Sequence, residues 1–499
     1  MKLHSFLASL LLTATATMAA DVPKITPADA AKLVADGKAV LVDVREPGEW
    51  ADTGVAAPAV MLAKSDFDGA QKEWKPFLEK NAGKEIILYC RTGHRAGLVG
   101  AALAEKGVNV ANAGGLKDWT DAGLPVRMAE NQLFEHIYGG VAGAYIGNAM
   151  GAPVEGWTWE KIEKTYGFLD KFIADPRGKG VPNQPGWTED GMERYKLLCR
   201  AIFKKGSRIN IEDLAQEWAE SIDPTRIGFR IGAQDRVIYD LIKAGLPPQE
   251  VGRYALWPGF MGTSKMMQPL GLINACRPDV AAKDALDIGR VKDSSGRPLW
   301  RVDKVNEDGR YKSTLIYNAA LENCAAIAAA TAEAMRPNAT VDSVIAVALA
   351  QLPPGARKDV ETTLGFADAA KDWKDFRTPY QKYWDGTPIS NAIDILAGGL
   401  ACFKLAKGQP REAVLYATNL GRDTDCKAYV AGGLAGTLRG IKAWPPEWVQ
   451  LVESAVATDP YTVDKKTARQ IAEGLYKVAL SELQKTKSQT AEVESLLAK

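Results

Sequence analysis

The sequence has few histidines and no excess of charge of either sign. Only His4, His94 and His136 occur in 499 residues, and 62 basic side chains face 61 acidic ones, for a net charge of +1. A balanced chain gives no indication of a nucleic-acid or anionic-membrane partner. A Ser-His-Asp triad or a histidine-rich zinc site in the large C-terminal part would depend on His136 alone, which argues against both.

Cysteine is also scarce, and its spacing is irregular. The six cysteines form no Cys-x-x-Cys pair and no regular framework, which argues against a disulfide scaffold. Only Cys90 has a setting that suggests chemistry. The others lie in apolar or helical settings and are expected to be small buried thiols: Cys199, Cys276, Cys324, Cys402 and Cys426.

Long hydrophobic runs are absent after the N-terminus. The first twenty residues combine Lys2, an apolar stretch at 6–12 and small residues before Asp21, a pattern typical of a secretory signal peptide. We therefore expect residues 1–20 to be removed and the mature chain to contain no membrane span. The expected location is outside the cytoplasm, in a bacterial periplasm.

A chain of 499 residues is too long for one ordinary core, and its texture changes near residue 130. Residues 21–130 alternate helical segments with short apolar runs at 39–42 and 85–89, which predicts an α/β domain with a parallel sheet and flanking helices. From 133 to 485, long helical periods rich in Ala, Gly and Leu predict an all-α domain. Residues 486–499 are expected to form a polar helical tail.

Small residues recur at every fourth position in two parts of the helical region. Glycines do so from Gly139 to Gly151, and alanine and glycine do so between 431 and 436. Neither segment provides 18 uninterrupted apolar residues, which argues against a membrane pair. We predict two helices packed closely together inside the domain core. The polar, glycine-rich segment 290–313 is expected to be a surface insertion.

Cys90 begins the sequence Cys-Arg-Thr-Gly-His-Arg between a predicted strand and a predicted helix at 96–106. A loop in this position directs backbone N–H groups inward, and the helix dipole adds positive potential, so a thiolate is stabilised and its pKa lowered. Arg91 and Arg95 add charge that can hold an anionic sulfur donor. Ala96 occupies the position where a Cys-x5-Arg phosphate loop needs arginine. The alternative is a structural buried cysteine beside two solvated arginines.

Two further stretches accompany the cysteine loop. Leu-Val-Asp-Val-Arg-Glu at 41–46 is followed by Glu49 and Trp50, and Asn-Ala-Gly-Gly-Leu-Lys-Asp-Trp occupies 112–119. Together with the loop, these stretches resemble the signatures of the rhodanese family over residues 25–128.

The rhodanese resemblance implies a sulfurtransferase that needs no cofactor. Cys90 would accept sulfane sulfur from a small-molecule donor as a persulfide and pass it to a thiol acceptor. Gly93 and His94 would belong to the substrate-binding loop, with Arg91 and Arg95 in catalytic roles. A redox-sensing or sulfide-sensing thiol at Cys90 is the alternative.

Two short acidic clusters begin helices in the C-terminal part. Thr188, Glu189 and Asp190 precede one helix, and Asp423 and Asp425 precede another. Hydroxyl and carboxylate oxygens brought together from two helix starts would suit a hard cation such as Mg²⁺ or Mn²⁺. Ordinary N-capping uses the same residue types, so the spacing alone leaves both interpretations open.

Four motifs of the C-terminal part resemble the ADP-ribosylglycohydrolase family over residues 134–447. They are the glycine-rich stretch 140–156, Thr-Glu-Asp at 188–190, Pro-Leu-Gly-Leu at 269–272 and Gly-Arg-Asp-Thr-Asp at 421–425. The resemblance implies cleavage of an ADP-ribosyl or related glycosidic bond with the help of two divalent ions, Mg²⁺ or Mn²⁺.

The same resemblance assigns roles to individual residues. Glu155 would lie beside the scissile bond. A central loop would contact the diphosphate through Gly262, Thr263 and Ser264. The ligands of the two ions would be Thr188, Glu189, Asp190, Asp423 and Asp425.

Several positions differ from the family pattern. Cys426 stands where the family has a hydroxyl ligand, and its soft sulfur should leave one tight ion and one weak or missing ion. Glu189 and Asn148 each stand where the family has aspartate, and Met266 where it often has arginine. A helical domain that binds a nucleotide or glycan without cleaving it is the alternative function.

Overall fold

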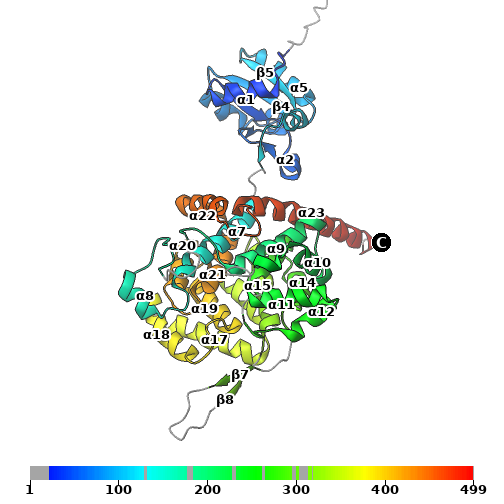
Figure 1. Ribbon diagram of the computed structural model, residues 1–499. Helices are drawn as coiled ribbons and strands as arrows, with labels where there is room; N and C mark the ends of the chain where they lie inside the picture. The colour runs from blue at the N-terminus through cyan, green and yellow to red at the C-terminus, as the bar shows by residue number, and fades with distance from the viewer. Residues whose placement is uncertain are drawn as a thin grey trace, which may run out of the picture. The chain divides into compact units, whose positions relative to one another are not determined.

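The computed structural model describes residues 22–127, 132–176, 184–226, 232–260, 264–294, 299–302, 313–316 and 318–497. The expected signal peptide lies outside these ranges. The chain divides into two compact units, Met1–Glu130 and Asn131–Lys499, which are coloured blue to cyan and cyan to red in Figure 1.

A parallel four-stranded sheet in the order β3-β1-β4-β5 forms the centre of the N-terminal unit. Its strands are β1 (Ala39–Asp43), β3 (Val60–Met61), β4 (Glu85–Cys90) and β5 (Val110–Gly115). A separate antiparallel pair joins β2 (Val55–Ala56) to β6 (Val126–Arg127). The predicted strands at 39–42 and 85–89 lie side by side in the sheet, with Val40 opposite Ile86. The apolar runs form strands because both faces of the sheet are buried, one against each of two apolar clusters.

Helices flank this sheet, as the sequence predicts. They are α1 (Pro27–Ala35), α2 (Pro47–Thr53), α3 (Lys64–Asp68), α4 (Trp74–Lys80), α5 (His94–Ala104) and α6 (Leu116–Asp121). The α5 helix begins two residues before the predicted start at 96, directly after the cysteine loop. After α5, residues 110–115 form β5 and pair with β4.

The C-terminal unit is mostly helical. Its α-helices are α7 (Gln132–Gly151), α8 (Trp159–Tyr166), α9 (Asp190–Lys205), α10 (Ile211–Ser221), α11 (Ala233–Lys243), α12 (Pro248–Val251), α13 (Gln268–Ile273), α14 (Pro278–Gly289), α15 (Ala320–Ala334), α16 (Val341–Ala350), α17 (Pro354–Ala369), α18 (Trp373–Trp384), α19 (Ala392–Leu405), α20 (Pro410–Thr418), α21 (Thr424–Arg439), α22 (Pro446–Thr458) and α23 (Ala468–Leu497). Short 3₁₀ helices are η1 (Ala152–Val154), η2 (Pro224–Arg226), η3 (Gly252–Tyr254), η4 (Ser264–Met267) and η5 (Ile441–Ala443).

Three predictions for this unit need correction. The region predicted to be all-α contains a strand pair, because Ser313–Ile316 forms strand β8 and pairs with β7 (Leu299–Val302). Helix α15 begins after this pair, at Ala320. The predicted surface insertion at 290–313 is wrong at its start, because Val291, Lys292 and Asp293 are buried, and the hairpin begins only at Leu299. The C-terminal tail is a continuation of α23 rather than a separate helix.

The predicted close packing of two glycine-rich helices is confirmed for α7 and α21. A Cβ atom added to Gly139, Gly143 or Gly147 would lie 2.1–2.3 Å from a backbone oxygen of α21. The partner oxygens belong to Gly436, Gly432 and Ala428, so the four-residue repeats of the two helices match in opposite directions. Only glycine allows two backbones to approach this closely. Among the described residues, no helix is both long and apolar enough to cross a membrane.

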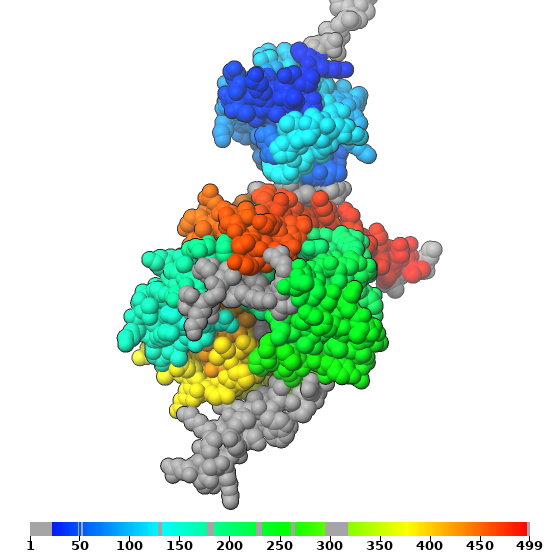
Figure 2. All heavy atoms as spheres, viewed as in Figure 1, coloured from blue at the N-terminus to red at the C-terminus, as the bar shows by residue number. Residues whose placement is uncertain are grey.

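Segments far apart in the sequence meet at the surface of the helical unit. Figure 2 shows the orange segment near residue 460 beside the green segment that begins near residue 190. Buried Glu193 accepts hydrogen bonds from the Val463 backbone and from Lys196, and the Lys196 ammonium also donates to Thr462 at 2.6 Å. These contacts fix the start of α9, which carries one of the two acidic clusters.

Candidate functional site

The cysteine loop joins the end of β4 to the start of α5. Cys90 is the last residue of β4 and is buried, and the Gly93 backbone N–H donates a hydrogen bond to its Sγ at 3.1 Å. Gly93 has φ +86°, a left-handed conformation that favours glycine. The glycine therefore allows the chain to curl so that a backbone N–H points at the sulfur.

The 112–119 motif supports this loop from the neighbouring strand. The Asn112 amide donates to the Gly93 carbonyl at 2.9 Å, and its Oδ1 accepts from the Gly114 N–H at 3.0 Å. A Cβ atom at Gly115 would lie 2.4 Å from the Arg91 carbonyl oxygen. The two glycines of the motif thus give the loop space to lie against β5, and the asparagine fixes its position.

Arg95 is held by a carboxylate that the sequence did not reveal. Its guanidinium makes two hydrogen bonds of 2.6 Å to Glu49 on α2. The pair raises the pKa of Arg95 and lowers the pKa of Glu49. Arg91 on the loop and His94, the first residue of α5, are both exposed. A paired fork of this kind orients the arginine beside Cys90, so that Arg95 is positioned as well as charged.

Part of the 41–46 motif is structural. The guanidinium of Arg45 is buried and hydrogen bonds both oxygens of buried Asp43, at 2.9 Å through Nε and 2.6 Å through Nη2. Nη2 also donates to the Gly54 carbonyl at 2.5 Å. This buried, fully hydrogen-bonded pair ties the end of β1 to the segment after α2. It thereby positions the helix that carries Glu49.

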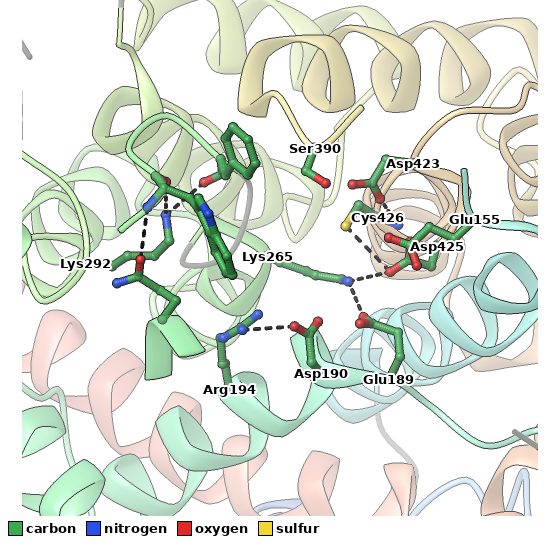
Figure 3. A pocket seen from close by; sticks show the side chains of 13 residues that line it. Glu155, Glu189, Asp190, Arg194, Lys265, Lys292, Ser390, Asp423, Asp425 and Cys426 are labelled. Carbon is green, nitrogen blue, oxygen red and sulfur yellow. Dashed lines mark hydrogen bonds and ion pairs between the residues drawn. The ribbon is translucent and has the colours of Figure 1, made fainter. Parts of the chain in front are cut away.

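A cavity of about 240 Å³ in the helical unit is lined by carboxyl side chains from three segments (Figure 3). Glu155 follows η1, Glu189 and Asp190 begin α9, and Asp423 and Asp425 begin α21. The structure therefore brings the two acidic clusters together. The remaining side chains of the lining are Arg194, Gln234, Trp257, Phe260, Lys265, Lys292, Ser390 and Cys426.

The glycine contact between α7 and α21 explains why these segments converge. At its end, a Cβ atom on Gly151 would lie 2.4 Å from the Asp425 backbone nitrogen. One turn earlier, the Asn148 amide donates to Glu189 Oε1 at 2.5 Å and to Asp425 Oδ2 at 3.3 Å. Asn148 Oδ1 accepts from the Glu189 N–H at 2.8 Å. Asn148, which departs from the family pattern, thus joins the two clusters.

Lys265 lies between the two clusters and was missed by the sequence analysis. Its ammonium is 2.6 Å from Asp425 Oδ2 and hydrogen bonds Glu189 Oε1, and its side chain is 2% exposed (Figure 3). Burial alone would lower the pKa of Lys265, but Asp425 and its other acidic neighbours outweigh burial and raise it. Burial likewise opposes ionisation of Glu189, yet the ammonium lowers the pKa of this carboxyl. Lys265 is therefore a charged, internal partner of both clusters.

Asp190 has a cationic partner of its own. Arg194, one turn along α9, donates to Asp190 Oδ2 at 2.9 Å. The same guanidinium makes two further bonds, of 2.7 and 2.8 Å, to buried Asp235 on α11. Arg194 is thus held by two carboxylates and positions the Asp190 side chain at the wall of the cavity.

The loop before α21 is held in an uncommon conformation. Arg422 has φ +64°, and its guanidinium pairs with buried Asp394 at 2.8 Å. The ammonium of Lys427, whose pKa is lowered by burial, donates to the Gly421 carbonyl at 3.0 Å. These contacts fix the backbone on both sides of Asp423, whose Oδ1 accepts from the Cys426 N–H at 3.3 Å.

The donor set does not fit a pair of divalent ions. Two of the expected ligands, Glu189 and Asp425, already share the Lys265 ammonium, and a third, Asp190, is paired with Arg194. Lysine and arginine thus supply positive charge where the two clusters converge. The expectation of Mg²⁺ or Mn²⁺ with one tight ion and one weak or missing ion stays a prediction. Carboxylate and sulfur atoms of Asp423, Asp425 and Cys426 still lie within 4.8 Å of one another.

The remaining expected site residues are distributed as follows. Thr188 is buried beside Glu189. Gly262 and Thr263, expected at the diphosphate, lie outside the described residues, and Ser264 begins η4. Cys276 is half-buried rather than buried, whereas the four other helical-domain cysteines are buried, and none of the six forms a disulfide within the described residues.

Comparison with known proteins assigns both units to families. The model of the ADP-ribosylglycohydrolase family matches residues 129–300 and 312–484. The chain belongs to the ADP-ribosylglycohydrolase family. The model of the Rhodanese-like domain matches residues 26–122, so this family member also carries a rhodanese-like domain. The two resemblances noted in the sequence are thereby confirmed.

Individual relatives are distant. The ADP-ribosylglycohydrolase region is similar to the uncharacterized protein YegU of Escherichia coli K12, with 22% identity over 62% of this chain and 90% of that protein. A solved structure described as "ADP-ribosylglycohydrolase-related protein complex" is 20% identical and covers 70% of this chain and 99% of its own, with a TM-score of 0.48. A rhodanese-related protein from Thermoplasma volcanium is 27% identical and covers 21% of this chain and 99% of its own, with a TM-score of 0.19.

Proposed function

We propose that the rhodanese-like domain transfers sulfane sulfur through a persulfide on Cys90. The observation that carries this proposal is the hydrogen bond from the Gly93 N–H to Cys90 Sγ at the start of α5. Backbone donors at a helix start stabilise negative charge on the sulfur. The nearby Arg95, oriented by Glu49, adds positive charge for an anionic donor.

The reaction has two steps with thiosulfate as donor. The Cys90 thiolate attacks the outer sulfur, the S–S bond of the donor breaks, and sulfite leaves with the bonding electron pair. An acceptor thiolate then attacks the outer sulfur of the Cys90 persulfide. The Cys90 thiolate is regenerated and the acceptor carries the sulfur away.

Mass spectrometry of the full-length chain after thiosulfate treatment tests this proposal. We expect one added sulfur on the Cys90 peptide, and no sulfur transfer to cyanide or a thiol by Cys90→Ser. The matched control is Cys276→Ser, because Cys276 is the half-buried thiol of the other unit and should leave transfer unchanged. Full transfer by Cys90→Ser would exclude the assignment. Reversible oxidation of Cys90 without any transfer would instead favour the sensing function.

For the helical domain, we propose that the 240 Å³ cavity binds an ADP-ribosyl or related glycoside and cleaves its glycosidic bond. Five carboxyl side chains from three segments can accept hydrogen bonds from sugar hydroxyls and orient a water molecule, with Glu155 at the scissile bond. Trp257 and Phe260 line the same cavity and offer aromatic faces to a planar ring. A polar wall and an aromatic wall together suit a nucleoside-like glycoside.

Binding and turnover of ADP-ribosyl compounds must be measured separately. We expect Asp423→Asn and Glu155→Gln to abolish hydrolysis while the protein remains folded, and Trp257→Ala to weaken binding of ADP-ribose. Glu412→Gln on α20 changes a half-buried side chain outside the cavity lining; this variant is the control and should change neither property. Binding of ADP-ribose by the unmodified chain without any turnover would support the non-catalytic binding module.

A further inference from the structure

We propose that the Lys265 ammonium takes the place of one divalent cation, so that the helical domain has a single metal position, formed by Asp423, Asp425 and Cys426. This inference rests on the proposed function in one respect: both take this cavity as the site that binds a ligand. It concerns the number and chemical class of the ions, which can be measured without any substrate.

The first argument is the place of the lysine. An ammonium that hydrogen bonds Glu189 and lies 2.6 Å from Asp425 bridges the two acidic clusters, which is what a shared ion would do. A Cβ atom on Gly191 would lie 2.2–2.5 Å from Cδ, Cε and Nζ of Lys265. The first turn of α9 therefore has glycine at the position where the lysine side chain passes, and the ammonium is enclosed by the protein.

The second argument is charge. Two buried carboxylates that approach one another without a cation repel and are costly to desolvate. The Lys265 ammonium offsets this repulsion at the junction of α9 and α21, and Arg194 does so for Asp190. A metal ion shared by Glu189 and Asp425 would have to displace an ammonium that the fold already holds.

The third argument is an oxygen that Lys265 leaves unused. Asp425 is 1% exposed, and within the described part of the chain its Oδ1 atom has no hydrogen-bond partner. Asp425 lines the cavity together with Asp423 and Cys426, whose ligand atoms lie within 4.8 Å of one another. A buried carboxylate oxygen without a partner is costly, and a cation at this position would satisfy it.

The ligand set indicates the class of the ion. Two carboxylates and one sulfur atom form a mixed hard and soft set, which suits Zn²⁺ or Co²⁺ better than Mg²⁺. Three protein ligands also leave a coordination position for water or a substrate oxygen. We therefore expect a single thiophilic ion in the cavity, next to the fixed positive charge of Lys265.

Titration of the metal-free full-length protein with Co²⁺ tests the proposal. We expect one bound ion per chain and a sulfur-to-cobalt charge-transfer band that is lost in Cys426→Ser. The control Cys402→Ser removes a buried thiol of α19 outside the cavity and should keep the band. Two ions in the unmodified protein, no bound ion, or one ion whose band survives in Cys426→Ser would each overturn the proposal.

Variants of Lys265 test the replacement itself. Lys265→Met should bind a second ion, because Glu189 and Asp425 lose their ammonium, whereas Lys265→Arg should still bind one. A folded Lys265→Met that binds one ion would overturn the replacement. If Lys265→Met does not fold, the double variant Lys265→Met/Glu189→Gln replaces it in the comparison, because this variant removes one charge of each sign. The double variant should bind one ion. Two bound ions in it would overturn the proposal. If the unmodified protein binds one ion but does not hydrolyse the glycoside, the proposed function fails and the proposal of a single metal position stands.

Discussion

The two oxygens of Glu49 each accept a 2.6 Å hydrogen bond from the guanidinium of Arg95, 46 residues further along the chain. Glu49 belongs to α2 and Arg95 to the first turn of α5, directly after the cysteine loop. The arginine beside Cys90 is therefore oriented by a second element of the rhodanese-like domain. Its position depends on Glu49 as much as its effect depends on its charge.

The geometry of this pair predicts that lysine cannot replace the arginine. Arg95→Lys keeps the charge but loses the two-pronged fork, so we expect kcat/KM with thiosulfate to fall about tenfold, or ~1.4 kcal/mol, and Arg95→Ala to fall further. Steady-state kinetics with cyanide as acceptor provides the measurement. Lys117→Ala, which removes an exposed ion pair, is the control and should have no effect. Equal rates for the unmodified protein and Arg95→Lys would show that only charge matters.

The same pair predicts a pH dependence of stability. Because Arg95 lowers the pKa of Glu49, the pair stabilises the folded domain fully above the unfolded pKa of about 4.3, and this contribution is lost as pH falls through the lower folded pKa. The stability difference between the unmodified protein and Glu49→Gln should be up to about 1 kcal/mol at neutral pH, since the pair is partly exposed. It should shrink toward zero in acid. Urea denaturation across this range checks the prediction, and a constant difference would contradict it.

Loss of Lys265 should destabilise the helical domain strongly. Lys265→Met leaves Glu189 and Asp425 buried without their cation, and we expect a loss of about 3–5 kcal/mol in the free energy of unfolding. Chemical denaturation in the presence of chelator measures this effect. The double variant Lys265→Met/Glu189→Gln removes one charge of each sign and should recover part of the loss. An unchanged stability of Lys265→Met would mean that the ammonium is not a partner of these carboxylates.

Gly→Ala substitutions should have opposite effects inside and outside the contact between α7 and α21. Gly147→Ala would bring a Cβ atom to 2.1 Å from the Ala428 carbonyl oxygen, so we expect a loss of more than about 3 kcal/mol or no folding. Gly365 on α17 is exposed and has nothing within 4 Å of an added Cβ atom. Gly365→Ala should therefore stabilise the protein by about 0.5–1 kcal/mol. Thermal unfolding of both variants tests the pair, and a tolerated Gly147→Ala would contradict the close approach.

Export is proposed from the N-terminal sequence alone. The apolar stretch after Lys2 and the small residues before Asp21 lead us to expect a mature chain that begins near Ala20 or Asp21 and is recovered outside the cytoplasm. N-terminal sequencing of the protein from fractionated cells checks this. A charge in the apolar stretch, as in Leu10→Arg, should keep the precursor in the cytoplasm. A mature protein that still begins with Met1 would rule out the proposed cleavage.

Local features of both units could be predicted from the sequence. The strand, loop and helix around Cys90 follow from an apolar run, a glycine that tolerates a left-handed conformation and a helical period. The glycines from Gly139 to Gly151 likewise predicted a close helix pair, because a four-residue repeat of small side chains places one smooth face on a helix. The structure departs from the all-α prediction at the β7–β8 hairpin, which precedes α15.

The sequence by itself thus determined the two families, the cysteine loop and the two acidic clusters, since each is encoded by residues close together in the chain. Only the tertiary structure decided which charges neutralise these groups. Glu49 reaches Arg95 across 46 residues, and Lys265 reaches Asp425 across 160. Such partners leave no periodic signal, because a lysine that points into a cavity and one that points into water have the same sequence pattern. Their pairing depends on how distant helices pack, and here the packing of α7 on α21 and of η4 on α9 brings the ammonium between the carboxylates.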